Sequence, residues 1–317
     1  MPTIFTPFGP VNALPGVEYY SDGQVRSCIA ATSSPLDTPL GVLMPQFTAN
    51  TLRKRQLPVI AFHPNGMIRT LPLEDETNIP TPIGEMPAEQ VTFYEDGALK
   101  RVFPLNGALS GYWTQEDEGK LVRSLALDTP LGRIHASLVS AYFAPNGRPR
   151  SLTLWPGTTL AVPGPVGSIL TRVGISWDDS GVLASLEPAG PTVVPTPIGP
   201  LVAYDSDAVG ICGDRNSLRF RQNGAVLGLV TTAHAFDVVL ENGRTRRLSP
   251  LLRINPCDGE SREPAPIAVE FGGGQVAFFV PGQPKLVVPE ERVTVSCFVM
   301  PLPAFGTVCR LGAGTLG

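Results

Sequence analysis

The side chains best suited to chemistry lie in one segment of this chain, residues 203–216, which reads AYDSDAVGICGDRN. Its candidate binding residues are three carboxylates, a guanidinium and an amide: Asp205, Asp207, Asp214, Arg215 and Asn216. Carboxylate and amide oxygens bind hard cations such as calcium, and paired carboxylates act as acid and base in hydrolysis. The spacing differs from that of a calcium loop, however, and Asp and Asn side chains often cap their own loop. We therefore expect separated carboxylates that accept backbone N–H bonds, and keep a cation or hydrolytic site as the alternative.

A second candidate binding segment begins at Tyr112 and Trp113, which are soon followed by the acidic run 116–118. Acidic residues are common at the exposed tips of hairpin loops, so the sequence predicts such a tip here. The alternative is a recognition loop, because Tyr and Trp supply contact area at interfaces and the acids would favour a basic partner. We include both aromatic residues among the tentative ligand-binding residues.

Motifs that identify enzymes or metal sites do not occur in the sequence. There is no nucleophile elbow, phosphate loop, dinucleotide fingerprint or calcium-loop pattern. The histidines are far apart and form no zinc motif: His63, His135 and His234. The cysteines are odd in number and form no CxxC pair: Cys28, Cys212, Cys257, Cys297 and Cys309. We therefore predict reduced thiols, no catalytic residue, no metal and no cofactor.

Charge and hydropathy narrow the range of partners. The net charge is −4 and no basic run occurs, which argues against nucleic acid as a partner, because phosphate binding requires clustered Lys and Arg.

Residues 1–16 lack the basic start of a secretory signal, so we expect a cytoplasmic protein. The uncharged stretch 294–309 contains Pro301 and Pro303 and is too short to span a membrane. We predict a buried strand there.

The elements that must position these residues are indicated by a repeated pattern. An aromatic residue lies four positions before a turn glycine, and Asp or Asn precedes the glycine in five of six copies. Asp and Asn tolerate positive φ, so each copy predicts a tight β-hairpin whose aromatic residue lies on a buried stripe. The six pairs are Tyr19/Gly23, Phe62/Gly66, Phe93/Gly97, Phe143/Gly147, Trp177/Gly181 and Phe220/Gly224.

A second turn pattern, Thr-Pro-x-Gly, alternates with the first. Proline presets φ for a type I turn, and a glycine with positive φ then closes the hairpin. The pattern occurs at 38–41, 81–84, 129–132 and 196–199, with a variant at 164–167. Each copy therefore predicts a further hairpin between the aromatic ones.

These patterns predict an all-β protein of consecutive antiparallel hairpins, with roughly 16 to 20 short strands in an elongated, twisted sheet that packs partly on itself. The alternative is a β-propeller, because six or seven units of about 40 residues also fit blades. The pattern frays after Gly224, and a shortened copy follows at Phe271, Gly274 and Val276. We divide the chain into a hairpin array, 1–250, and a degenerate C-terminal capping unit, 251–317.

Residues 93–113, FYEDGALKRVFPLNGALSGYW, resemble the variant MORN repeat of bacterial proteins. Residues 19–27 and 62–70 match the first half of that repeat, whereas the Thr-Pro-x-Gly turns depart from it. The whole chain also resembles a group of bacterial proteins that share this segment, TPIG turns and the AYD segment, here 203–218. The resemblance implies a hairpin-repeat fold and a role in interaction, and it brings no catalytic residue.

Two classes of function follow. The first is a non-enzymatic binding or scaffold protein, with another protein as the expected partner, because repeat arrays expose a long continuous surface. The second is a metal-binding or hydrolytic enzyme centred on 203–216. We favour the first class because no nucleophile is accompanied by a base in the sequence. The oligomeric state is left open.

Overall fold

The computed structural model describes residues 1–49, 51–208, 212–255 and 258–299. It contains 29 strands in these ranges, more than the sequence led us to expect, because many hairpin arms are only two to four residues long. Neighbouring strands are antiparallel throughout the main sheet. The predicted all-β class of antiparallel hairpins is thus confirmed.

A single sheet of 16 strands runs the length of the molecule. Its strands follow chain order in space, and only β15 (Leu160–Gly164) lies off this path, on β16. The others, from the N-terminal end, are β3 (Glu18–Tyr19), β4 (Val25–Cys28), β7 (Ile60–Phe62), β8 (Ile68–Thr81), β9 (Gly84–Phe93), β10 (Leu99–Phe103), β13 (Leu138–Phe143), β14 (Pro149–Leu154), β16 (Gly167–Trp177), β17 (Leu183–Pro188), β20 (Leu218–Phe220), β21 (Val226–Thr231), β26 (Ile267–Gly272), β27 (Gln275–Phe279) and β28 (Leu286–Pro289).

The remaining strands form small sheets beside the main one. The two-stranded pairs are β1 (Thr3–Thr6) with β2 (Gly9–Asn12), β5 (Leu36–Thr38) with β6 (Gly41–Leu43), β11 (Leu125–Thr129) with β12 (Gly132–Ala136), β18 (Thr192–Val194) with β19 (Leu201–Ala203), and β24 (Leu252–Ile254) with β25 (Arg262–Pro264). A three-stranded sheet joins β23 (Thr245–Leu248), β22 (His234–Val239) and β29 (Val293–Cys297). The helical elements are α1 (Gln115–Gly119) and the 3₁₀ turn η1 (Glu290–Arg292).

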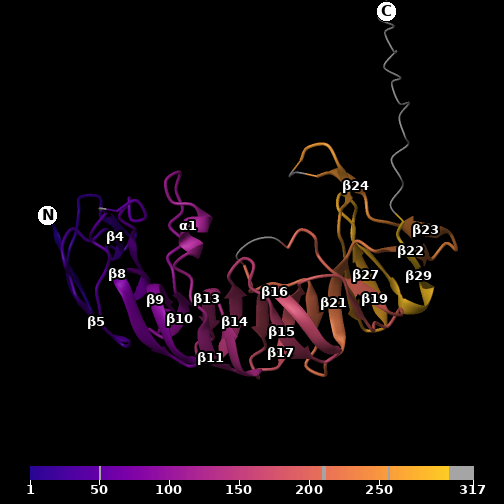
Figure 1. The fold of residues 1–317 in the computed structure, drawn as a ribbon, viewed down its shortest axis with the longest axis horizontal. Coiled ribbons are helices and arrows are strands. Elements are labelled where there is room, and N and C mark those ends of the chain that lie inside the picture. Colours follow the sequence, from indigo (N-terminus) through magenta and orange to yellow (C-terminus); the bar gives the residue numbers. More distant parts are fainter. Residues whose placement is uncertain (50, 209–211, 256–257, 300–317) are drawn as a thin grey trace, which may run out of the picture.

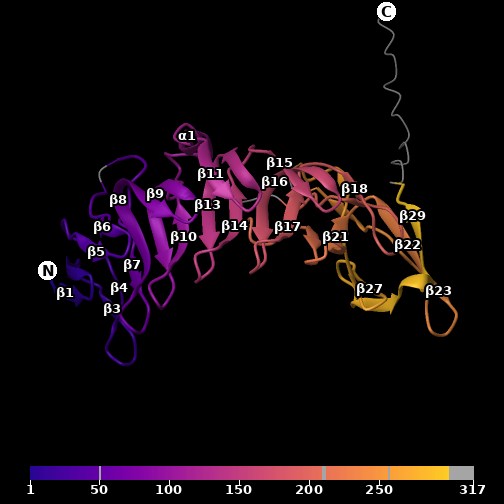
Figure 2. The same cartoon turned by 90° about the horizontal axis from the view of Figure 1, so that it is seen from below.

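The molecule is an elongated, curved band whose two ends bend toward the same side (Figure 1). The short helix α1 and the β24–β25 hairpin rise on this inner side of the curve, and Figure 2 shows the band and its hairpin loops from below. The sheet is open and ends in two separate edge strands, β3 and β28, so the propeller alternative is wrong. The small sheets other than β24–β25 share one hydrophobic core with the main sheet, so the hairpin array packs partly on itself.

Five of the six repeat aromatics form the predicted buried stripe. Phe62, Phe93, Phe143, Trp177 and Phe220 are each at most 4% exposed and belong to the common core. The prediction is wrong for Tyr19, which is 55% exposed. Tyr19 lies on the edge strand β3, so no preceding unit covers it. Its neighbour Tyr20 instead reaches the next hairpin and donates its hydroxyl to the Phe62 carbonyl at 2.8 Å.

The glycine of every aromatic hairpin has positive φ, between 81° and 86°. The preceding Asp or Asn does not, because among the described residues only Val173 has positive φ without being glycine. Its side chain accepts a backbone hydrogen bond instead, as when Asp96 Oδ1 accepts from the Ala98 N–H at 2.9 Å. The same contact forms at Asp22, Asn65, Asn146 and Asn223. Asp and Asn are thus used here as turn acceptors.

The Thr-Pro-x-Gly turns are closed by the threonine hydroxyl as well as by the glycine. Thr81 Oγ1 accepts from the Ile83 N–H at 3.3 Å and donates to the Gly84 carbonyl at 2.5 Å. Thr38, Thr129 and Thr196 donate to their glycine carbonyls in the same way. A copy that our sequence analysis missed, Thr6-Pro-Phe-Gly9, joins β1 and β2 with both bonds.

The stretch 294–309 is only partly a strand within the described residues. β29 ends at Cys297 and pairs with β22, and its side chains are half-buried or exposed. The prediction of a buried strand is therefore wrong for this part, because β29 pairs on one side only. Residues 300–309 lie outside the described residues.

Replacing Phe93 with alanine should lower the free energy of unfolding by about 3–5 kcal/mol, because it empties a packed position in the core. Tyr19→Ala is the matched control: Tyr19 holds the same repeat position but is exposed, and we expect a loss of no more than about 0.5 kcal/mol. Urea unfolding monitored by circular dichroism measures both. Equal losses would contradict a role for the buried stripe in stability.

Replacing Gly132 with alanine should cost about 1–2 kcal/mol, because the residue has a φ of 92° and a side chain there strains the backbone. No atom lies within 4 Å of an added Cβ at this position, so the cost comes from the backbone alone. Gly111→Ala is the control, because that site is equally open but has no positive φ. Thermal unfolding should separate the two, and equal stability would show that the turn tolerates a side chain.

Candidate functional site

Residues 204–208 and 212–217 lie between β19 and β20, where the chain enters the main sheet again, and we call these described residues the crossing segment. At the crossing, Gly213 lies directly on the backbone of β14 and β16, and its N–H donates to Thr153 Oγ1 at 3.0 Å. A Cβ on Gly213 would come within 2.6 Å of the Leu152 carbonyl oxygen, and one on Gly174 within 2.1 Å of the Gly213 Cα. Two glycines are therefore required for this approach.

The strand beneath the crossing is distorted at the same place. Val173 has a φ of 58°, a conformation that β-branched residues rarely adopt. The pairing of β16 with β17 shifts between Arg172 and Ile175, which marks a β-bulge. Such local strain persists only where the surrounding packing holds it, and it often accompanies functional sites.

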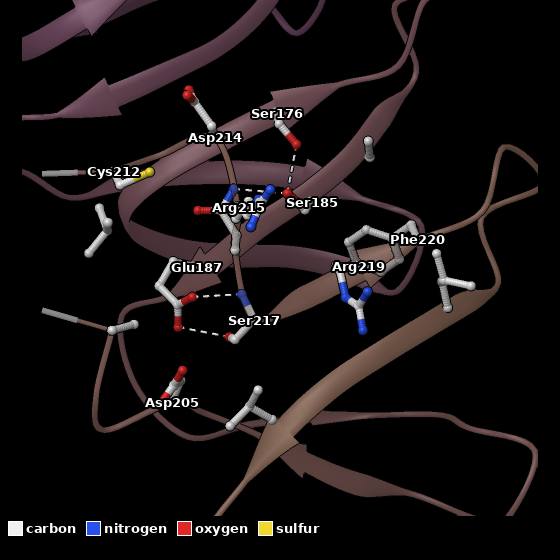
Figure 3. A pocket seen from close by; sticks show the side chains of 16 residues that line it. Ser176, Ser185, Glu187, Asp205, Cys212, Asp214, Arg215, Ser217, Arg219 and Phe220 are labelled. Atoms are coloured by element: carbon white, nitrogen blue, oxygen red, sulfur yellow. Dashed lines mark hydrogen bonds between the residues drawn. The ribbon is translucent and has the colours of Figure 1, made fainter. Parts of the chain in front are cut away.

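A cavity of about 720 Å³ opens beside the crossing segment, with β16, β17, β20 and β21 forming the rest of its lining. The side chains around it include Val173, Glu187, Asp205, Asp214 and Asn216 (Figure 3). A second cavity of about 480 Å³ extends toward the β24–β25 hairpin. Both are lined by Asp205 and Val230, so the two cavities are adjacent, and we call them together the crossing groove.

Glu187 is the most deeply buried carboxylate of the groove, at 2% exposure. Ser217 donates to it twice at 2.8 Å, from its N–H to Oε2 and from its hydroxyl to Oε1. Burial nevertheless raises the pKa of Glu187 to about 7, against the hydrogen bonds from Ser217. Sequence analysis missed this residue, because it lies within an otherwise apolar strand and far from 203–216 in the chain.

Asp205 is the one predicted aspartate that behaves as a loop cap. Its Oδ1 accepts from the Asp207 N–H at 2.9 Å. Burial raises its pKa, and the charge of Asp207 adds to this effect. Figure 3 shows the carboxyl groups of Asp205 and Glu187 pointing toward each other across one end of the cavity.

The other two aspartates bind arginines of distant strands rather than backbone N–H groups, which corrects our expectation for both. Arg253 of β24 donates to Asp207 Oδ2 at 2.7 Å, and this hydrogen bond lowers the pKa of Asp207. Asp214 accepts from Arg101 Nη2 and from Ser151 Oγ, both at 2.5 Å. These arginines lie far from the segment in sequence, and only the folding of the sheet brings them within reach.

Arg215 and Asn216 differ in burial although they are adjacent. Arg215 is exposed at the surface of the cavity, between Asp214 and Glu187 in Figure 3. Asn216 is 6% exposed, and its Nδ2 donates to Ser185 Oγ at 2.8 Å and to the Gly213 carbonyl at 3.0 Å. Asn216 therefore anchors the crossing segment to β17.

The predicted loop tip at 116–118 is a short helix instead. The N-cap Thr114 accepts from the Asp117 N–H at 3.2 Å, and Asp117 Oδ2 accepts from the Thr114 N–H at 3.1 Å. The sequence contains this capping box as Thr-x-x-Asp, but we did not use the motif to predict a helix. The helix turns Glu118 inward, where it is fully buried, so the predicted exposure is wrong for this residue.

Glu118 belongs to a buried ion-pair network below α1. Arg53 donates to Glu118 Oε2 at 2.7 Å and to Glu89 Oε1 at 2.7 Å, and Trp113 Nε1 donates to Glu118 Oε2 at 2.6 Å. Burial alone would raise the pKa of Glu118, but the hydrogen bonds from Arg53 and Trp113 outweigh it and lower that pKa. Trp113 thus has a structural partner.

Tyr112 lies outside the crossing groove. It is 65% exposed, and the Arg55 guanidinium lies over its ring at 3.9 Å. Both residues line a separate cavity of about 390 Å³. The structure therefore divides the predicted site residues between two places, with Tyr112 and Trp113 near α1 and the other five in the crossing segment.

The described cysteines Cys28, Cys212 and Cys297 are free thiols, and burial raises the pKa of Cys28 to about 11. Cys257 and Cys309 lie outside the described residues. Within the described ranges, no group of three or more His, Cys, Asp or Glu side chains could hold a metal ion. Neither helical element of the described chain has the length and apolar character that a membrane crossing requires.

Comparison with known proteins gives no relative: no protein-family model, curated protein or solved structure matches the chain.

The raised pKa of Glu187 predicts a specific dependence of stability on pH. The folded state binds the Glu187 proton more tightly than the unfolded state, in which the pKa is near 4.5. The free energy of unfolding contributed by this group should therefore be greatest below pH 4.5 and fall by up to about 3 kcal/mol as the pH rises to about 7. Glu187→Gln removes this titration, so the wild type should lose stability relative to the variant over this range. Parallel curves of unfolding free energy against pH would refute the assignment.

Proposed function

We propose that the protein is a non-enzymatic, cytoplasmic binding protein that holds a polypeptide segment in the crossing groove. The observation that carries this proposal is the adjacency of the two cavities, which share Asp205 and Val230. Each cavity has the size of a small-molecule site, about 300–1,000 Å³, and together they exceed that range. Two adjacent cavities suit an extended chain better than a compact ligand.

The lining of the crossing groove fits a peptide. Apolar contact is supplied by Leu227 and Val230 in the larger cavity and by Leu251 and Phe279 in the smaller. Charged side chains border these surfaces, so a chain that alternates apolar and polar side chains finds partners for both. An interaction role also agrees with the resemblance to the variant MORN repeat.

A hydrolytic enzyme is the second candidate, and the pKa of Glu187 near 7 is the observation that favours it, because general acids operate in this range. Two contacts argue against it. Both oxygens of Glu187 accept hydrogen bonds from Ser217, and Asp207 and Asp214 are committed to arginines. We therefore favour binding.

Selection of displayed random peptides on the immobilised protein tests the proposal. Selected peptides should lose affinity by at least about tenfold, or about 1.4 kcal/mol, when Ala184→Trp or Ala268→Trp fills one of the two cavities. Ala161→Trp is the matched control, because Ala161 is exposed on β15 outside the groove. Fluorescence polarisation gives the dissociation constants. Failure to enrich any peptide, or equal binding to all three variants, would overturn the proposal.

A further inference from the structure

The lining of the larger cavity includes hydrogen-bond acceptors from three side chains. Glu187 and Asp205 contribute carboxyl groups that point toward each other (Figure 3). Asn216 lines the same cavity and is adjacent to Ser217, the residue that binds Glu187. The three acceptors therefore come from β17 and from both ends of the crossing segment.

The amide of Asn216 is oriented without ambiguity. Its Nδ2 must donate to the Gly213 carbonyl, which is only an acceptor, so Oδ1 takes the opposite position. Oδ1 is buried and has no hydrogen-bond partner among the described residues. It is the one polar side-chain atom of the cavity lining in this condition. A buried acceptor without a donor is destabilising, and a ligand that supplies a donor would recover this free energy.

The charged groups around Glu187 and Asp205 can accept a further cation. Arg172 acts on both Glu187 and Asp205, and Arg253, which also acts on Asp205, is hydrogen-bonded to Asp207 and Glu263. Of the basic residues that line the cavity, Arg219 is paired with Glu270 at 2.8 Å and Arg215 is exposed, so that water screens its charge.

We infer that Glu187, Asp205 and Asn216 bind a primary ammonium group, supplied by a lysine side chain of the bound polypeptide. An ammonium group carries three N–H donors and no acceptor, which matches three acceptor side chains. It also supplies a further positive charge beside the two carboxyl groups. This inference rests on the proposed function, and it names the side chain that the groove selects.

The test is a titration of the full-length protein with Nα-acetyl-lysine N-methylamide, followed through the backbone amide resonance of Ser217. We expect a saturable shift that the uncharged norleucine analogue does not produce. Glu187→Gln and Asp205→Asn keep the shape of each side chain, and each should weaken binding by at least about tenfold. Asp214→Asn is the matched control: it removes a charge from the same cavity, but Asp214 is already paired with Arg101. It should leave the affinity within about twofold.

Three results would overturn the inference. They are no shift with the lysine probe, equal shifts with the norleucine analogue, or equal weakening by Asp214→Asn in a protein that remains folded by circular dichroism. Stronger binding of n-butylammonium than of the lysine probe would refute the lysine source and indicate a free amine. The peptide selection distinguishes the two proposals: groove-dependent peptides without lysine would refute the ammonium site and leave the proposed function intact.

Discussion

A glycine with positive φ closes each aromatic and each Thr-Pro-x-Gly hairpin, and the rest of the structure depends on this constraint. Without a Cβ, the chain reverses within a few residues and strand follows strand in chain order. In five of the six aromatic units, the aromatic residue four positions earlier is thereby placed in the common core, and the exception is Tyr19 on the edge strand β3. A sheet built from such local contacts elongates by repetition, and it needs no closure into a barrel or propeller.

The candidate site arises where the repetition is interrupted. The chain leaves the main sheet after β17 and enters it again at β20, and just before β20 the contact between Gly213 and Gly174 holds it close to the strands. The crossing carries polar residues over β16 and β17, next to the bulge at Val173. The regular hairpins supply the rigid floor of the groove, and the crossing segment supplies one of its walls.

Buried charges are compensated differently below α1 and in the crossing groove. Below α1, Arg53 lies between Glu89 and Glu118 with short hydrogen bonds, so the charges compensate one another inside the protein. In the crossing groove, Glu187 receives hydrogen bonds from Ser217 alone, and burial raises its pKa to about 7. Because burial of a charge is costly without a partner, the first region is complete in itself, whereas the second gains by accepting a cation.

The all-β class, most of the hairpin turns and five core aromatics could be predicted from the amino-acid sequence, because these depend on residues a few positions apart. The sequence also indicated the segment that forms the wall of the groove. Three features follow from the folded structure and not from local patterns: Glu187 lies beside this segment, Arg101 and Arg253 bind Asp214 and Asp207, and Glu118 is buried beside Arg53. These contacts join residues 30 to more than 100 positions apart, and no local pattern encodes which strands will be neighbours where the repeat is irregular.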